Sequence, residues 1–107
     1  MFVGNIAVRV VDIVEETPTI KRFKLAPIEN KPLPVFSGGS HITTIVQKNE
    51  AILERHYSLI SHPTKQRDFY EIAISLNDKS SGGSLYWHTQ MKIGDELEIS
   101  LPKNQFA

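Results

Sequence analysis

The stretch LERHYSLIS, residues 53–61, places a cation and a phenol two residues apart. On an extended strand, Arg55 and Tyr57 project from the same face about 6.7 Å apart. A guanidinium can grip an anion through paired hydrogen bonds, and a phenol offers a flat face to another ring. The pair therefore suggests a site for an anion that is attached to an aromatic ring system.

The run SSGGS, residues 80–84, is the second candidate for chemistry. A helix is expected to begin near Gly83 or Ser84, because side chains at helical spacing follow. Glycines ahead of a helix let backbone N–H groups approach a phosphate, and the helix dipole favours the anion. Since the chain order is strand, hairpin and glycine-led helix, Arg55 can serve the same phosphate. Together the two segments describe a nucleotide-like ligand.

Each of these segments also has a purely structural interpretation. An Arg-x-Tyr pair on a strand is typical of a cross-strand ion pair beside a core tyrosine, and Gly-Gly-Ser is a common turn and helix cap. The four histidines show no helical ligand pair and no acidic companion at ligand spacing, so we expect no metal site. No Ser-His-Asp or paired-carboxylate arrangement stands out, so we expect no catalytic residue within this chain.

Six short strands are expected to position these residues. The candidates are residues 5–15, 19–27, 41–48, 53–61, 68–76 and 94–102. The alternation of the first strand slips at Val10 and Val11, as it does at a β-bulge or where both faces of a strand are buried. Six strands, mostly connected by hairpins, together with one helix before the last strand predict an all-β fold, a six-stranded antiparallel Greek-key barrel with one short capping helix. Closure into a barrel removes the edges that a flat sheet exposes.

Alternating strand residues supply the expected core. The inward positions are Phe23 and Leu25, then Tyr70, Ile72 and Ile74, and finally Leu97, Ile99 and Leu101. In the helix, Leu85, His88 and Met91 share helical spacing, and His88 is expected at the solvent edge. Tyr86 and Trp87 are expected in the core or at a surface between domains, with stacking on an adenine as an alternative.

Composition limits the classes of partner. The chain has 107 residues, enough for a single domain spanning residues 1–107, and twelve basic residues balance twelve acidic ones. Without a net cationic field, we expect neither nucleic acid nor membrane as a partner. No apolar run approaches the roughly 20 residues that span a bilayer, and no signal peptide is evident. Because cysteine is absent, a reducing, cytoplasmic location is expected.

Four segments in a fixed order extend this interpretation. RHYSL, YEIAISL, GGSLYWH and ISLPKNQF resemble the flavin-binding (FR-type) β-barrel of the ferredoxin-reductase superfamily. The branch that the chain resembles most is that of the phthalate dioxygenase reductase-like enzymes, which includes the vanillate O-demethylase reductases. The resemblance covers nearly the whole chain.

The resemblance implies a set of cofactor-binding residues. These are Arg55, His56, Tyr57, Ser58, Ala73, Ile74, Ser75, Gly82, Gly83 and Ser84. By this resemblance, Arg55 and the Gly-Gly-Ser run would hold the flavin phosphate, and Tyr57 would lie against the isoalloxazine. The backbone of residues 73–75 would read the pyrimidine edge, and Ser58 would bond near N5. Strict alternation puts Ser58 on the face opposite Tyr57, so either its backbone N–H acts or the strand twists at its end.

The resemblance also implies more protein than this chain contains. It implies FMN, with FAD as the alternative, and an NAD(P)H-binding domain and a four-cysteine 2Fe–2S domain in the same full-length chain. A terminal oxygenase component would be the partner of that reductase. Residues 1–107 are then expected to be a fragment that binds flavin without turning over NAD(P)H. The alternative is a non-redox β-barrel binding module of the oligonucleotide-binding type, which the zero net charge disfavours.

Overall fold

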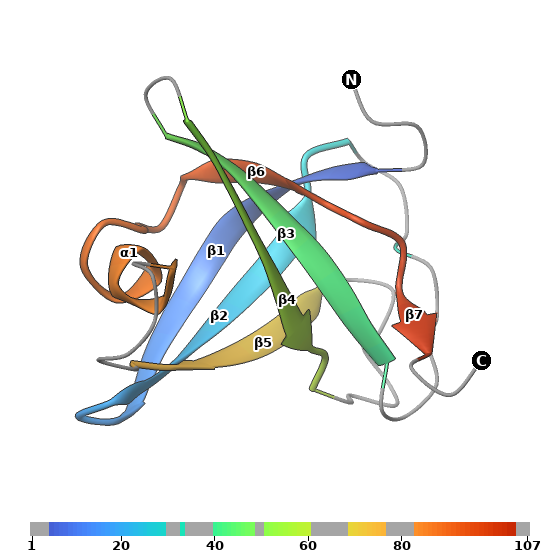
Figure 1. The fold of residues 1–107 in the computed structure, drawn as a ribbon. Coiled ribbons are helices and arrows are strands. Elements are labelled where there is room, and N and C mark those ends of the chain that lie inside the picture. Colours follow the sequence, from blue (N-terminus) through green and yellow to red (C-terminus); the bar gives the residue numbers. More distant parts are fainter. Residues whose placement is uncertain are drawn as a thin grey trace.

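A computed structural model describes residues 5–29, 33, 40–48, 51–60, 69–76 and 83–104. Strands and one helix follow each other along the chain as the sequence predicts (Figure 1). Their bounds are β1 Ile6–Thr17, β2 Ile20–Pro27, β3 Ser40–Lys48, β4 Ala51–Ser58, β5 Tyr70–Ser75, α1 Gly83–Thr89, β6 Glu96–Ile99 and β7 Lys103–Asn104. The helix begins at Gly83, as predicted.

The strands form one antiparallel sheet that closes on itself. The strand order is β4-β3-β6-β1-β2-β5, and β7 pairs with the first two residues of β3. The two end strands meet through a bridge between Leu59 and Ile72, where the N–H of Ile60 donates to the carbonyl of Glu71 at 2.8 Å. The predicted antiparallel barrel with a capping helix is therefore confirmed. The two-residue strand β7 was not predicted, because it is too short to show alternation.

A β-bulge in β1 keeps its apolar side chains in the core on both sides of Val11. The register with β2 shifts between Val10 and Asp12, which leaves Val11 outside the pairing and 42% exposed. Val8 and Val10 are fully buried before the shift, and Ile13 packs against the core after it. The slip predicted at Val10 and Val11 is thus confirmed, and it keeps apolar side chains inward on both sides of the bend.

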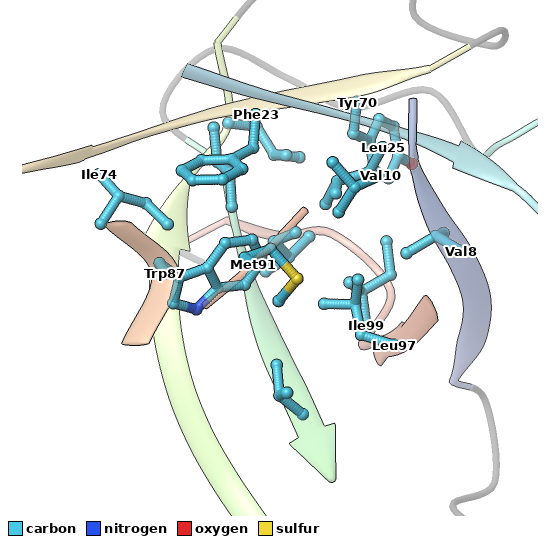
Figure 2. Packing of buried hydrophobic residues seen from close by; sticks show 14 of the residues in the cluster. Val8, Val10, Phe23, Leu25, Tyr70, Ile74, Trp87, Met91, Leu97 and Ile99 are labelled. Carbon is cyan, nitrogen blue, oxygen red and sulfur yellow. The ribbon is translucent and has the colours of Figure 1, made fainter. Parts of the chain in front are cut away.

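Trp87 of α1 fills one end of the barrel. Its indole is fully buried and meets the ring of Phe23 edge to face, with 4.9 Å between the ring centres. Figure 2 shows Trp87 next to Met91, with Phe23 facing it from β2. A short helix is only marginally stable by itself, so this buried aromatic contact helps to hold α1 on the barrel.

The inward assignment of Leu101 was wrong. Leu97 and Ile99 are buried as predicted, but Leu101 is 47% exposed. The alternation ends at Ser100, which is itself buried and whose N–H donates to the carbonyl of Thr43 at 2.9 Å. The hydroxyl of Ser100 also accepts the N–H of Thr43 at 2.9 Å. Two consecutive buried residues break the period of two and turn Leu101 outward.

The described helix is too short to cross a lipid bilayer. It has seven residues, whereas a membrane-spanning helix needs about 20.

Tyr70 predicts how the barrel responds to alkaline pH. Its side chain is 1% exposed, and burial raises its pKa to about 12, above the ordinary value near 10. The stability that comes from the neutral phenol is fully present below about pH 10 and is lost as the pH rises through the folded-state pKa. We expect about 2 kcal/mol less unfolding free energy at about pH 11.5 than at about pH 8 from this group alone.

Urea unfolding followed by the fluorescence of the single tryptophan measures this loss. The variant Tyr70→Phe is the control, because it keeps the ring and removes the titrating hydroxyl. The difference between the two pH values should shrink in this variant. An equal alkaline loss in both proteins would show that Tyr70 is not its source.

Candidate functional site

The β4 strand presents Arg55 and Tyr57 on one face. Both side chains are partly buried on the side of β4 that faces the barrel, and Tyr57 packs against the core. The neighbouring Glu54, His56 and Ser58 are exposed on the other face. Arg55 lies opposite Thr44, whose hydroxyl donates to the carbonyl of Arg55 at 3.1 Å. The cation and the phenol therefore have the common face that their spacing predicts.

The end strands β4 and β5 touch at one point and then separate. Past the bridge between Leu59 and Ile72, the described chain shows no further pairing between them. In Figure 1 the two strands diverge from this point, and α1 lies beside the far end of β5. The helix packs against both strands. We call this place the β4–β5 opening and define it by residues 55–58, residues 73–75 and α1.

The rings of Tyr57 and Trp87 connect the two sides of the opening. Their centres lie 5.8 Å apart at an interplanar angle of 79°. Because Trp87 is anchored in the core, this edge-to-face contact fixes where the phenol of Tyr57 lies. Arg55 on β4 and the helix that begins at Gly83 are therefore on the same side of the barrel, as one shared ligand would require.

The end of β5 directs backbone groups toward β4. In an antiparallel strand, successive residues point their N–H and C=O groups to alternate edges. The carbonyl of Glu71 accepts from Ile60 on the β4 side, and the N–H of Leu76 donates to Thr19 on the β2 side at 2.6 Å. By this alternation, the backbone groups of Ala73 and Ser75 face the β4 side. Both residues are exposed.

Burial and charge act in opposite directions on Tyr57. Burial raises the pKa of its hydroxyl, and the nearby Arg55 guanidinium lowers it by a smaller amount. The net effect is a raised pKa, so the phenol is neutral at physiological pH. The opening thus offers a fixed cation and an uncharged hydroxyl-bearing ring side by side.

Two hydrogen bonds fasten the end of α1 to the barrel. The ammonium of Lys21 on β2 donates to the carbonyl of His88 at 2.8 Å. The Nε2 atom of His88 lies 2.7 Å from the carbonyl oxygen of Ile74. His88 is 9% exposed, so its expected place at the solvent edge was wrong. A cation at the end of a helix also interacts favourably with the helix dipole.

The remaining predicted residues lie around the opening or outside the described chain. Gly83 and Ser84 form the first turn of α1, and Gly82 lies outside the described residues. Ser58 and His56 share the outward face of β4, as alternation predicts. Trp87 lies in the core, one of its two expected places.

A shallow hollow of about 320 Å³ lies at the end of β4. Its lining residues are His41, His56, Tyr57 and Ser58. The imidazole rings of His41 and His56 are 6.3 Å apart, and Nδ1 of His56 lies 2.8 Å from the hydroxyl of Thr43. Within the described residues, no group of three or more metal-ligating side chains occurs.

Sequence reasoning missed Lys21 and His88 as supports of the opening. The helical spacing of His88 with Leu85 and Met91 was a signal that it faces the barrel. Nothing local indicates Lys21, because its partner is 67 residues away in the sequence.

Known proteins with similar sequences include reductase subunits and oxidoreductases. No protein-family model matches the chain. The carnitine monooxygenase reductase subunit of Escherichia coli (strain K12) is 41% identical over 100 residues, which cover 94% of this chain and 31% of that protein. The vanillate O-demethylase oxidoreductase of Acinetobacter baylyi is 34% identical over 102 residues, covering 95% of this chain and 31% of that protein.

A solved structure extends the similarity to the fold. Phthalate dioxygenase reductase, described as a modular structure for electron transfer from pyridine nucleotides to a 2Fe–2S centre, superposes with a TM-score of 0.83 at 29% identity. The match covers 95% of this chain and 30% of that one, so the chain spans about a third of these relatives. The chain belongs to the ferredoxin-reductase-like family, as an FR-type β-barrel domain.

Proposed function

We propose that this chain is the flavin-binding part of an NAD(P)H-dependent reductase that passes electrons through the flavin to a 2Fe–2S centre and then to an oxygenase component. The observation that carries the proposal is the convergence of residues 55–58, residues 73–75 and α1 on one opening of the barrel. The names of the relatives, reductase subunits of oxygenase systems, support the same assignment.

The groups at the β4–β5 opening fit a flavin. Arg55 would hold the phosphate together with the Gly-Gly-Ser run of residues 82–84, and Tyr57 would shelter one face of the ring. Within residues 73–75, the backbone groups of Ala73 and Ser75 would bond the pyrimidine edge, because alternation directs them toward β4. His56 and Ser58 would complete the contacts at the end of β4. When bound, the flavin accepts an electron pair from a nicotinamide and releases electrons singly.

This chain contributes binding and orientation, and we assign it no catalytic residue. The neutral phenol of Tyr57 would limit the access of water to the flavin ring, since it is partly buried against Trp87.

FMN is the flavin that we propose, in preference to FAD. Trp87 is fully buried among core residues, so it offers no exposed face on which an adenine could stack. Tyr86, which is partly buried, is the neighbouring aromatic residue on α1. A direct grip by Arg55 suits a terminal phosphate, as in FMN.

The other redox centres are proposed to lie in the rest of a longer protein. The chain has no cysteine, so it cannot supply the four thiolates of a 2Fe–2S cluster. It also spans only 31% of the carnitine monooxygenase reductase subunit. We propose that a nicotinamide-binding domain and an iron–sulfur domain complete the reductase, and that the protein works in the cytoplasm. The oligonucleotide-binding alternative is not favoured, because the relatives are reductases.

The substitution Arg55→Ala tests the proposed phosphate grip. The loss of a charged hydrogen bond costs about 1.5–3 kcal/mol, so the dissociation constant for FMN should rise about 10- to 100-fold. Quenching of flavin fluorescence on titration with the protein measures this constant. The matched control is Arg9→Ala, which removes the same charge at a different place. Arg9 on β1 pairs with Glu96 on β6. Equal FMN binding by both variants would contradict the assigned role of Arg55.

A comparison of FMN with FAD tests the choice of cofactor. If no adenine site exists, the chain should bind FMN at least as tightly as FAD, and Tyr86→Ala should change both affinities alike. The same fluorescence titration measures both. Tighter binding of FAD that is lost selectively in Tyr86→Ala would show that Tyr86 stacks on an adenine and that FAD is the cofactor.

A further inference from the structure

A buried histidine joins the helix to the strand segment that is proposed to read the flavin ring. His88 lies inside the barrel end, and its Nε2 atom is 2.7 Å from the carbonyl oxygen of Ile74. A carbonyl carries no proton, so Nε2 must hold the hydrogen and donate it. Ile74 is the central residue of the segment 73–75. The imidazole therefore contacts the backbone of that segment directly.

The contacts around His88 form a closed circuit of three elements. Ile74 on β5 pairs with Lys21 on β2 in the strand register. The ammonium of Lys21 donates to the carbonyl of His88 at 2.8 Å, and the imidazole of His88 returns to Ile74. Each of β2, β5 and α1 is thus held by the other two. A closed circuit restricts the end of β5 more than any single contact does.

The end of β5 needs such a restraint. Beyond the bridge at Ile72, the described chain shows no further pairing with β4, so Ile74 and Ser75 have a neighbouring strand on the β2 side only. A strand end held along one edge can shift and twist more than one held along both. We infer that His88 is a positioning residue that holds the backbone of residues 73–75 in register for the pyrimidine edge of the flavin ring. This inference rests on the proposed function.

Removal of the imidazole donor tests this role. In His88→Leu, one hydrogen bond is lost, which corresponds to FMN binding about 3- to 10-fold weaker. His88→Gln keeps an N–H near the position of Nε2 and should restore most of the affinity. If His88→Leu does not fold, Lys21→Met is the second variant. It removes the hydrogen bond from β2 to the carbonyl of His88, and we expect it also to weaken FMN binding. Circular dichroism and the emission of Trp87 report whether each variant is folded.

The absorption spectrum of the fully FMN-bound protein separates positioning from general stability. Weaker contacts at the pyrimidine edge should shift the visible flavin bands and the midpoint potential in His88→Leu, and His88→Gln should return both toward the starting values. A folded His88→Leu with an unchanged spectrum and potential overturns the inference, even if affinity falls, because the loss then arises away from the ring. If the unaltered protein binds neither FMN nor FAD, the proposed function itself fails. That outcome is distinct from a failure of His88 alone.

Discussion

The architecture depends on how the barrel closes. Within the described residues, the end strands β4 and β5 meet at one bridge, between Leu59 just past β4 and Ile72 of β5, and then part. A sheet that closed along its full length would leave no backbone group of β5 facing outward for a ligand. A sheet that did not close at all would leave Arg55 and Ala73 on distant edges. Because β4 and β5 meet only briefly, the sheet closes into a barrel and still leaves the β4–β5 opening.

Helix α1 lets the barrel keep the β4–β5 opening without exposing its apolar interior. An unfilled barrel end would expose the apolar interior between β2 and β5, but Trp87 occupies it and contacts both Phe23 and Tyr57. Full burial of an aromatic side chain contributes about 1.5–3 kcal/mol, a sizeable share of the stability of a small domain. The same indole therefore supports the core and sets the position of the phenol at the opening.

The sequence was sufficient to predict the elements whose side chains follow the regular alternation of a strand or the regular spacing of a helix. The bulge at Val11 is a break in alternation, and the start of α1 at Gly83 follows from a turn run before a helical pattern. The inward prediction for Leu101 was wrong because the alternation continues in the sequence, whereas Ser100 bonds Thr43 on the neighbouring strand β3, 57 residues away in the chain. Polar contacts between distant residues leave no trace in alternation.

The candidate site was predictable in its parts and not in its assembly. The side-chain pattern placed Arg55 and Tyr57 on one face, which the structure confirms. That β5 and α1 meet this face depends on where β4 and β5 separate, and this is a property of long-range pairing. His88 shows the same limit: its residue type suggested a surface position, whereas its bond partner, the carbonyl of Ile74, can be identified only in the folded chain.

A ligand in the β4–β5 opening would change the free energy of unfolding of the whole barrel. A ligand that bonds the free side of β5 and the cation of β4 bridges the two strands where they do not bridge each other. Such a ligand binds the folded state alone, because the unfolded chain does not bring residues 55–58 near residues 73–75. The free energy of binding is then added to the free energy of unfolding. The β4–β5 opening would thus couple the stability of the barrel to the presence of a bound ligand.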